Sequence, residues 1–158
     1  FNLIAKHFHF SFPCPLQVRW QNRFRRDRGK TCEVTVDGTD CRIEEPSPSS
    51  REWHSHNFHG PCLRCEVAVC IQTGDVVWIN GAFKPGRWSD LMTFRRNLKQ
   101  RLAPGEMVEA DNGCRGEPDH ARTADGFVSL ADDRAKWHAR SRHETANRRL
   151  KQWGCLKR

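Results

Sequence analysis

The order of the short apolar segments constrains this chain more than any other feature. Residues 32–37 alternate apolar and polar and are rich in β-branched side chains, which predicts a strand. Residues 63–71 and 76–83 show the same pattern on either side of the turn signal Thr73-Gly74-Asp75, so they predict a β-hairpin. Residues 107–110 predict a fourth, shorter strand.

Two helices are expected among these strands. The first begins at an N-cap provided by Ser89 or Asp90, and Pro104-Gly105 ends it. Its apolar stripe consists of Leu91, Phe94, Leu98 and Leu102. The last helix runs from about Arg134 to Trp153. The order of strand, hairpin, helix, strand and helix predicts an α/β fold with one mixed central sheet and flanking helices.

The chain of 158 residues has room for one ordinary domain. We expect residues 1–30 to form an N-terminal arm or remnant helix, residues 31–158 to form the domain, and residues 45–53 and 117–133 to be irregular. No apolar run approaches the roughly 20 residues of a membrane span and no signal-peptide layout is visible, so we expect a soluble, unexported chain. The eight cysteines show no compact disulfide framework and are expected to be reduced.

Positive charge is concentrated at one end of the chain. Residues 134–158 hold nine Lys or Arg and one acid, a surplus equal to the net charge of +8 of the whole sequence. Such a concentration indicates a polyanionic partner, with nucleic acid first. A solvated basic helix explains the same charge equally well.

Two aspartates directly follow predicted strands and lead into loops. Asp37 precedes a glycine, and Asp111 lies in the sequence Glu-Ala-Asp-Asn-Gly. In α/β sheets, the loops beyond strand ends gather ligands and catalytic groups. Either aspartate alone is more ordinary as a turn residue.

The last helix adds a third carboxylate. Glu144 is surrounded on one helix face by Trp137, Arg140, Arg148 and Lys151, and Ala135, Ala139, Ala146, Leu150 and Trp153 collect on the opposite face. Pairing of Glu144 with arginines one turn away is the simple structural explanation. Asp37, Asp111 and Glu144 together would nevertheless offer three hard oxygen ligands, which suit Mg²⁺ or Mn²⁺.

These residues carry a family resemblance. The segments Val36–Asp40, Pro85-Gly86 with Asp90, and Glu109–Gly113 with Arg115-Gly116 resemble the DDE superfamily endonuclease domains of PIF/Harbinger-type transposases and their bacterial insertion-sequence relatives. Related bacterial transposases carry the spaced set Tyr-x2-Arg-x3-Glu-x6-Lys on the last helix. Trp137, Arg140, Glu144 and Lys151 fall at that spacing, with Trp137 in place of tyrosine. The resemblance covers roughly residues 31–157.

The resemblance implies a ribonuclease-H-like fold and a DNA phosphoryl-transfer enzyme. Asp37, Asp111 and Glu144 would be the catalytic acids and would bind two divalent metal ions, Mg²⁺ or Mn²⁺, for hydrolysis and strand transfer. The implied DNA contacts are Arg115, Arg140, Arg148 and Lys151. The partners would be the transposon ends and the target DNA, with no membrane. Action on chromosomal DNA implies the nucleus in a eukaryote and the cytoplasm otherwise.

Other interpretations remain open. No helix-turn-helix precedes the core, which leaves room for a homo-oligomer or a separate DNA-binding partner. The chain ends seven residues after Lys151, so a truncated, inactive transposon remnant that only binds nucleic acid through its basic helix is the alternative. We expect Asp40, in a loop, and Asp90, as a helix N-terminal acid, not to be direct metal ligands. Asp90 could still support the site from the second shell.

A zinc site and a cysteine nucleophile are two further kinds of site that His and Cys residues of the sequence could form. His54, His56, His59, Cys62 and Cys65 suggest zinc, but no second ligand pair follows at the usual spacing, and in a strand Cys62 and Cys65 would point to opposite faces. A zinc-stapled interaction module is therefore the third and weaker possibility. Nothing in the spacing singles out a nucleophilic Cys114–histidine pair.

Overall fold

A computed structural model describes residues 32–123 and 130–152 of the chain. The strands are β1 (Cys32–Arg42), β2 (His54–Ser55), β3 (Gly60–Cys70), β4 (Val76–Phe83), β5 (Met107–Ala110) and β6 (Ala121–Arg122). The α-helices are α2 (Asp90–Arg96) and α3 (Leu130–Gln152), and the 3-10 turns are η2 (Arg51–Trp53), η3 (Leu98–Arg101) and η4 (Asn112–Cys114). None of the described helices has the length and apolar character needed to cross a membrane.

The strands form one mixed sheet in the order β2-β3-β1-β5-β6, with β4 also paired to β3. Strand β3 is antiparallel to both β1 and β4, whereas β5 is parallel to β1 and β6 is parallel to β5. The parallel connection from the β3–β4 hairpin to β5 passes through α2, because parallel neighbours need a crossover rather than a tight turn. The predicted mixed sheet with flanking helices is confirmed.

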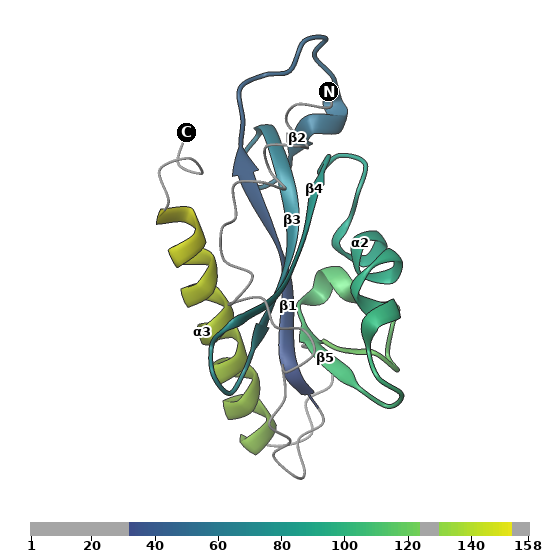
Figure 1. Ribbon diagram of the computed structural model, residues 1–158, viewed down its shortest axis with the longest axis vertical. Helices are drawn as coiled ribbons and strands as arrows, with labels where there is room; N and C mark the ends of the chain where they lie inside the picture. Colours follow the sequence, from purple (N-terminus) through teal and green to yellow (C-terminus); the bar gives the residue numbers. More distant parts are fainter. Residues whose placement is uncertain (1–31, 124–129, 153–158) are drawn as a thin grey trace.

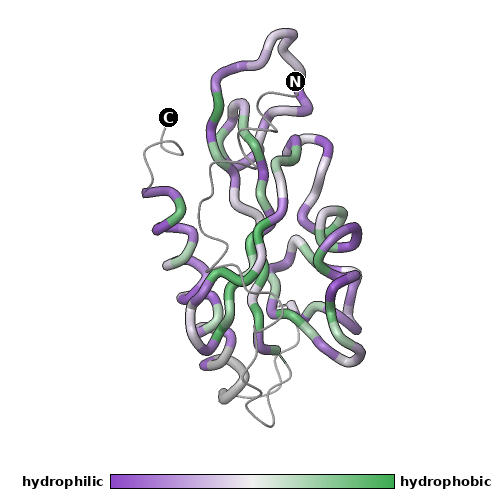
Figure 2. The backbone as a smooth tube through the Cα atoms, in the orientation of Figure 1, coloured by the Kyte–Doolittle hydropathy of each residue, from purple (hydrophilic) through white to green (hydrophobic). Residues whose placement is uncertain are grey.

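Helices cover both faces of the sheet (Figure 1). The α2 side buries the larger cluster, in which Val34, Val36 and Val108 of the sheet pack with Phe94 and Leu98. On the α3 side a smaller cluster joins Val67 and Val69 of β3 to Ala146. The apolar residues accordingly follow the central strands, whereas hydrophilic residues are frequent along the helices (Figure 2). Sheet strands buried on both faces are expected of a three-layer α/β domain.

Several local predictions are confirmed. Strands β4 and β5 have the predicted bounds, and the β3–β4 hairpin turns through Gly74, whose φ of 77° suits a residue without Cβ. Ser89 is the N-cap of α2, and its side chain accepts a hydrogen bond from the backbone N–H of Met92. On α3, Ala139 and Ala146 are buried, whereas Trp137 is 72% exposed, as the predicted helix faces require.

Other local predictions are wrong in their bounds. Asp37-Gly38 does not end β1, because pairing with β3 continues from Asp37 to Arg42 and overrides the local turn signal. Asp40 therefore lies in a strand and not in a loop. The first helix stops at Arg96, and its apolar stripe continues through the 3-10 turn η3. Helix α3 begins at Leu130, inside the segment expected to be irregular. The arm expected at 1–30 lies outside the described residues.

Candidate active site

Parallel pairing of β1 with β5 brings the two predicted catalytic aspartates together. Val36 pairs with Ala110 at the end of β5, and each of these residues is followed directly by an aspartate. Lateral neighbours in a parallel pair lie about 4.8 Å apart and point to the same face of the sheet. Asp37 and Asp111 are therefore placed side by side where β5 ends and β1 continues.

The pKa of Asp37 is raised by burial and by its acidic neighbours. Burial, the nearby charge of Asp111 and, more weakly, that of Asp90 raise the pKa of Asp37 to about 6. The hydrogen bond that the Gly38 N–H donates to Asp37 Oδ1, at 2.7 Å, opposes this rise. Like charges that disfavour each other's ionisation form a site in which a cation would be stabilised.

Asp111 caps the turn that follows β5. Its Oδ1 accepts a hydrogen bond from the Gly113 N–H at 2.8 Å, and its backbone begins the 3-10 turn η4. Asp111 is exposed, so its carboxylate is accessible to solvent at the end of β5. Cys114, at the end of the same turn, is buried, and burial raises the pKa of its thiol to about 12. A thiolate nucleophile at Cys114 is thereby disfavoured.

Helix α3 contacts the first aspartate through two side chains that the sequence did not single out. The amide of Asn147 donates a hydrogen bond to Asp37 Oδ2 at 3.5 Å, and His143 Nε2 lies 4.0 Å from the same oxygen. His143 is 3% exposed, and burial lowers its pKa to about 4, so it is neutral beside Asp37 at physiological pH. Asn147 and His143 thus contact Asp37 without charge, while the charge of Lys151 on the same helix acts to lower the pKa of Asp37.

Glu144 lies one residue beyond His143 but on the solvent side of α3. It is exposed and lines an open groove with Asn147, Arg148, Lys151 and Gln152. Through Asn147, this groove adjoins the carboxylate of Asp37. Within residues 32–123 and 130–152, no three His, Cys, Asp or Glu side chains are arranged to bind one ion. The structure thus places Asp37 beside Asp111, and the complete triad with Glu144 stays a prediction.

Arg64 and Asp40 form a buried ion pair. Arg64 of β3 donates two hydrogen bonds to Asp40, at 2.7 and 3.0 Å, and Ser55 donates a third. Burial alone would raise the pKa of Asp40, but the hydrogen bonds from Arg64 and Ser55 hold it below its ordinary value. Both carboxylate oxygens of Asp40 accept hydrogen bonds from Arg64 or Ser55, and Asp40 thereby holds the Arg64 guanidinium in place.

The sequence of residues 36–158 matches the family described as DDE superfamily endonuclease. This chain is a member of that family. The match includes the strand that carries Asp37 and the helix that carries Glu144, and the ribonuclease-H-like fold class predicted from the resemblance agrees with the observed sheet and helices. Comparisons with curated proteins and with solved structures gave no match.

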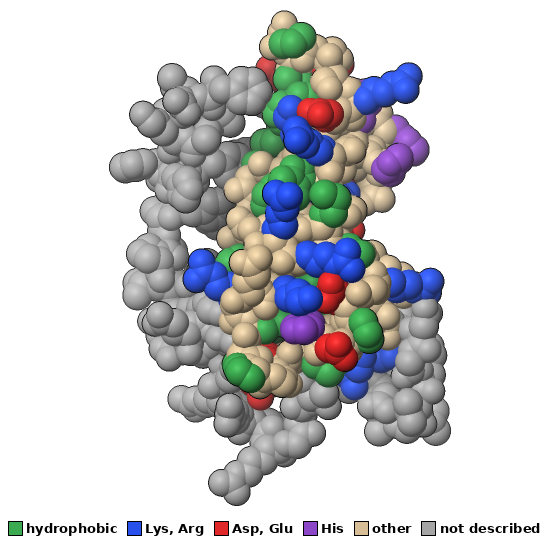
Figure 3. All heavy atoms as spheres, turned by 90° about the vertical axis from the view of Figure 1, so that its right-hand side faces the viewer, with side chains coloured by type: hydrophobic (Ala, Val, Ile, Leu, Met, Phe, Trp, Pro, Cys, Tyr) green, Lys and Arg blue, Asp and Glu red, His purple; other side chains and the backbone are tan. Residues whose placement is uncertain are grey.

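The cations predicted to contact DNA in this DDE endonuclease domain lie on two surfaces. Arg140 and Arg148 are exposed on α3, and Lys151, on the same helix, stacks over the ring of Phe58 at 5.5 Å. Arg115 is exposed in the loop after η4. On the α2 side of the molecule, Lys and Arg alternate with acids, and Arg95 and Lys99 are both paired with Glu117 (Figure 3). Three of the four predicted DNA contacts therefore lie on α3.

The zinc interpretation gains no support from the DDE domain structure. Cys62 is fully buried in β3, and Cys65 packs on the opposite side of that strand against the α3 cluster. His54, His56 and His59 are exposed, and His59 has a positive φ of 51°. Among the residues described, no group of His, Cys, Asp and Glu is set to hold a metal ion. The thiols of Cys32, Cys62, Cys65, Cys70 and Cys114 are free, as expected.

The donor groups present suit the divalent metals that DDE endonucleases usually use. Asp37 and Asp111 supply hard carboxylate oxygens, and burial together with repulsion from Asp111 raises the pKa of Asp37. A divalent cation would remove that repulsion. Sequence reasoning missed Arg64 and Glu66, which are buried or nearly buried in β3. Their signal was two charged residues inside an otherwise apolar strand, a pattern that marks paired or functional groups.

Proposed function

We propose that this DDE endonuclease domain is a metal-dependent DNA endonuclease that hydrolyses phosphodiester bonds and transfers strands. The observation that carries the proposal is the parallel register of Val36 with Ala110, since the residues that follow them, Asp37 within β1 and Asp111 after β5, are then neighbours. Glu144 is proposed as the third acid, because its helix already contacts Asp37 through Asn147.

Mg²⁺ or Mn²⁺ is the proposed cofactor, held in a two-metal site by Asp37, Asp111 and Glu144. When bound, such ions supply an activated water and stabilise the leaving 3′ oxygen. The protein's own part is to hold the carboxylates: the Gly38 N–H fixes Asp37 Oδ1, and the Gly113 N–H fixes Asp111 Oδ1. The second oxygen of Asp37 accepts the hydrogen bond of Asn147, and the bond to Asp111 leaves the second oxygen of that carboxylate for another partner.

DNA is proposed to lie along the groove on α3. Arg148 and Lys151 line it together with Glu144, so phosphate-binding cations flank the third acid. Arginine can contact a phosphate through two parallel hydrogen bonds, whereas lysine acts as a point charge. Arg140 and Arg115 would extend the contact to neighbouring phosphates.

A second candidate is a remnant that binds nucleic acid but does not cut it. Two observations favour this alternative. Glu144 is exposed, and no group of three His, Cys, Asp or Glu side chains in the described part of the chain is set to hold an ion. Such a protein would bind DNA with little sequence preference, and its affinity would fall linearly with salt on a logarithmic plot.

Nicking of supercoiled plasmid by the purified chain, with Mg²⁺ or Mn²⁺, separates the two candidates. The expected result is metal-dependent nicking that Asp111→Asn and Glu144→Gln both abolish. Asp119→Asn is the matched control, because this aspartate is exposed and is not among the residues assigned to the site.

DNA binding measured on the same proteins completes the test. A catalytic domain keeps its DNA affinity in Glu144→Gln, since that change removes a negative charge beside Arg148. Absence of nicking by the parent chain, with salt-dependent binding intact, would instead establish the remnant.

A further inference from the structure

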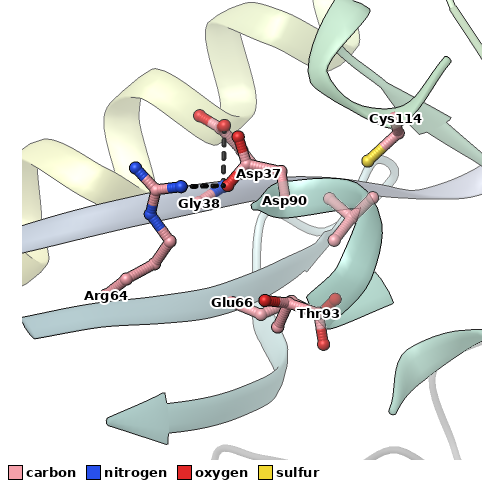
Figure 4. Close-up of a pocket in the computed structure, with 8 residues that line it drawn as sticks. Asp37, Gly38, Arg64, Glu66, Asp90, Thr93 and Cys114 are labelled. Atoms are coloured by element: carbon pink, nitrogen blue, oxygen red, sulfur yellow. Dashed lines mark hydrogen bonds and ion pairs between the residues drawn. The ribbon is translucent and has the colours of Figure 1, made fainter. Parts of the chain in front are cut away.

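A small cavity lies beneath the backbone of Gly38, next to the proposed catalytic aspartates (Figure 4). Its free space is about 10 Å³, which is room for about one water-sized group. The charged side chains around it come from three elements: Asp37 from β1, Arg64 and Glu66 from β3, and Asp90 from the start of α2.

Asp90 lies close to Gly38, within β1, and to Gly113, in the turn after β5. A Cβ atom on Gly38 would lie 2.3 Å from Asp90 Oδ1, and a Cβ on Gly113 would lie 2.9 Å from Asp90 Oδ2. The same Cβ on Gly113 would also lie 2.9 Å from Asp111 Oδ1. Both positions therefore need glycine to admit this carboxylate, and Asp90 shares the space at Gly113 with Asp111.

The three aspartates repel one another. Asp90 and Asp111 both reach the space beside Gly113, and Asp90 and Asp37 line the same cavity. Without a cation between them, like charges move to the largest separation that their side chains allow. A group of three carboxylates close enough to bind one ion is thus expected only when the ion is bound.

Arg64 holds Asp90 toward the cavity. Its Nη1 lies 3.2 Å from Asp90 Oδ1 and also donates to the Trp88 carbonyl oxygen. The remaining nitrogens of Arg64 are occupied by the buried Asp40. Since Asp40 fixes the guanidinium, the ion pair fixes the direction of the Asp90 side chain.

Glu66 supplies an independent sign of a ligand in this cavity. The residue is 4% exposed, and its Oε2 accepts a hydrogen bond from Trp78 Nε1. Its Oε1, in contrast, is buried without a hydrogen-bond partner. Buried polar atoms nearly always have partners, so this orphaned oxygen on the cavity indicates that something occupies it.

We propose that Asp90 is a further carboxylate of the metal site, and that the cavity between Asp37, Asp90 and Glu66 takes a divalent cation of the Mg²⁺ or Mn²⁺ class. Arg64 is a positioning residue that keeps Asp90 in place. This inference rests on the proposed metal-dependent function, and it adds a ligand from the crossover helix to the acids on β1, on α3 and after β5.

Binding of Mn²⁺ to the full chain without DNA, measured by isothermal titration calorimetry, tests the proposal. Asp90→Asn keeps the shape of the side chain and an acceptor for Arg64 but removes the charge. It is expected to weaken Mn²⁺ binding at least tenfold, as Asp111→Asn should, whereas Asp119→Asn should bind like the parent. A purely structural role for Asp90 would lower the melting temperature of the metal-free variant and leave the Mn²⁺ affinity of the folded fraction unchanged.

Carbodiimide labelling of carboxylates in the parent chain, read by mass spectrometry, needs no variant. Bound Mn²⁺ should protect Asp90 together with Asp37 and Asp111 and leave Asp119 reactive. Parental Mn²⁺ affinity in Asp90→Asn, or labelling of Asp90 unchanged by Mn²⁺, overturns the assignment of Asp90 while loss of binding in Asp111→Asn keeps the proposed function. A parent chain that binds no Mn²⁺ overturns both.

Discussion

The side-chain amide of Asn147 donates a hydrogen bond to Asp37 Oδ2 at 3.5 Å, across 110 positions of sequence. This contact joins α3, which carries Glu144, to the strand that carries the first aspartate. Asn147 can also form it without adding charge to the acidic group. The helix that supplies the proposed third acid is thus aligned on β1 by a neutral residue.

Replacement of Asn147 by alanine should impair the proposed nuclease without unfolding it. The change removes the link between α3 and Asp37, and residues that orient metal ligands typically contribute about 10- to 100-fold to affinity or activity. We expect plasmid nicking to fall about tenfold. Thr145→Ala, on an exposed position of the same helix whose hydroxyl donates only to the Ser141 carbonyl oxygen, should nick like the parent. Equal nicking by both variants would show that the contact does not align α3.

Asp37→Asn should raise the stability of the metal-free chain in a pH-dependent way. The folded-state pKa of Asp37, about 6, is above its ordinary value, so its contribution to stability is full below the ordinary value and is lost as pH rises through 6. At pH 7.5 the parent therefore carries an unfavourable charge that the variant lacks. Because the Asp37 side chain is 37% exposed, solvent screening reduces the effect to about 1 kcal/mol, or roughly 2–4 °C.

Thermal melts with a metal chelator at pH 4 and pH 7.5 provide the measurement. The excess melting temperature of Asp37→Asn over the parent should be present at pH 7.5 and nearly vanish at pH 4. Asp119→Asn should show no such difference. An excess of the same size at both pH values would mean that the charge of Asp37 is not disfavoured in the fold.

Glu66→Gln should remove a second part of the pH dependence. Burial raises the pKa of Glu66 to about 7, so the stability that its protonated form provides is lost as pH rises from about 4.5 through 7. Glutamine stays neutral and can still accept the Trp78 hydrogen bond, and it should therefore lose less stability than the parent between pH 5 and pH 8. Glu66→Ala loses the bond and leaves a void, which should cost about 1–3 kcal/mol in urea unfolding. Parallel pH profiles for the parent and Glu66→Gln would contradict this expectation.

The sequence predicts the sheet better than it predicts the cavity beside it. Alternating Val34 and Val36 and the short run at β5 define strands whose apolar residues have one possible destination, the core. The signal at Asp37-Gly38 is local, and the pairing of β1 with β3 overrides it. The same strand pairing places Asp40 beside Arg64, which no single-strand pattern can show.

The charged groups around the cavity were harder to predict because each depends on partners far away in the sequence. Asp90 is an ordinary helix N-terminal acid when only its neighbours are considered. Its proximity to Asp111 arises from the crossover through α2, and its tether to Arg64 arises from β3. Likewise, His143 is one residue in a basic helix until the packing of α3 on β1 places it against Asp37.

The register between β1 and β5 determines the spacing between Asp37 and Asp111. Val34, Val36 and Val108 are buried, and their fit in the core decides which residues of the two strands stand opposite each other. A slip of two residues would keep every side chain on its own face of the sheet. At roughly 3.3 Å per residue, however, it would move Asp111 about 7 Å along β1 relative to Asp37. Changes in the apolar core that never touch a carboxylate would therefore alter the spacing of the proposed catalytic acids.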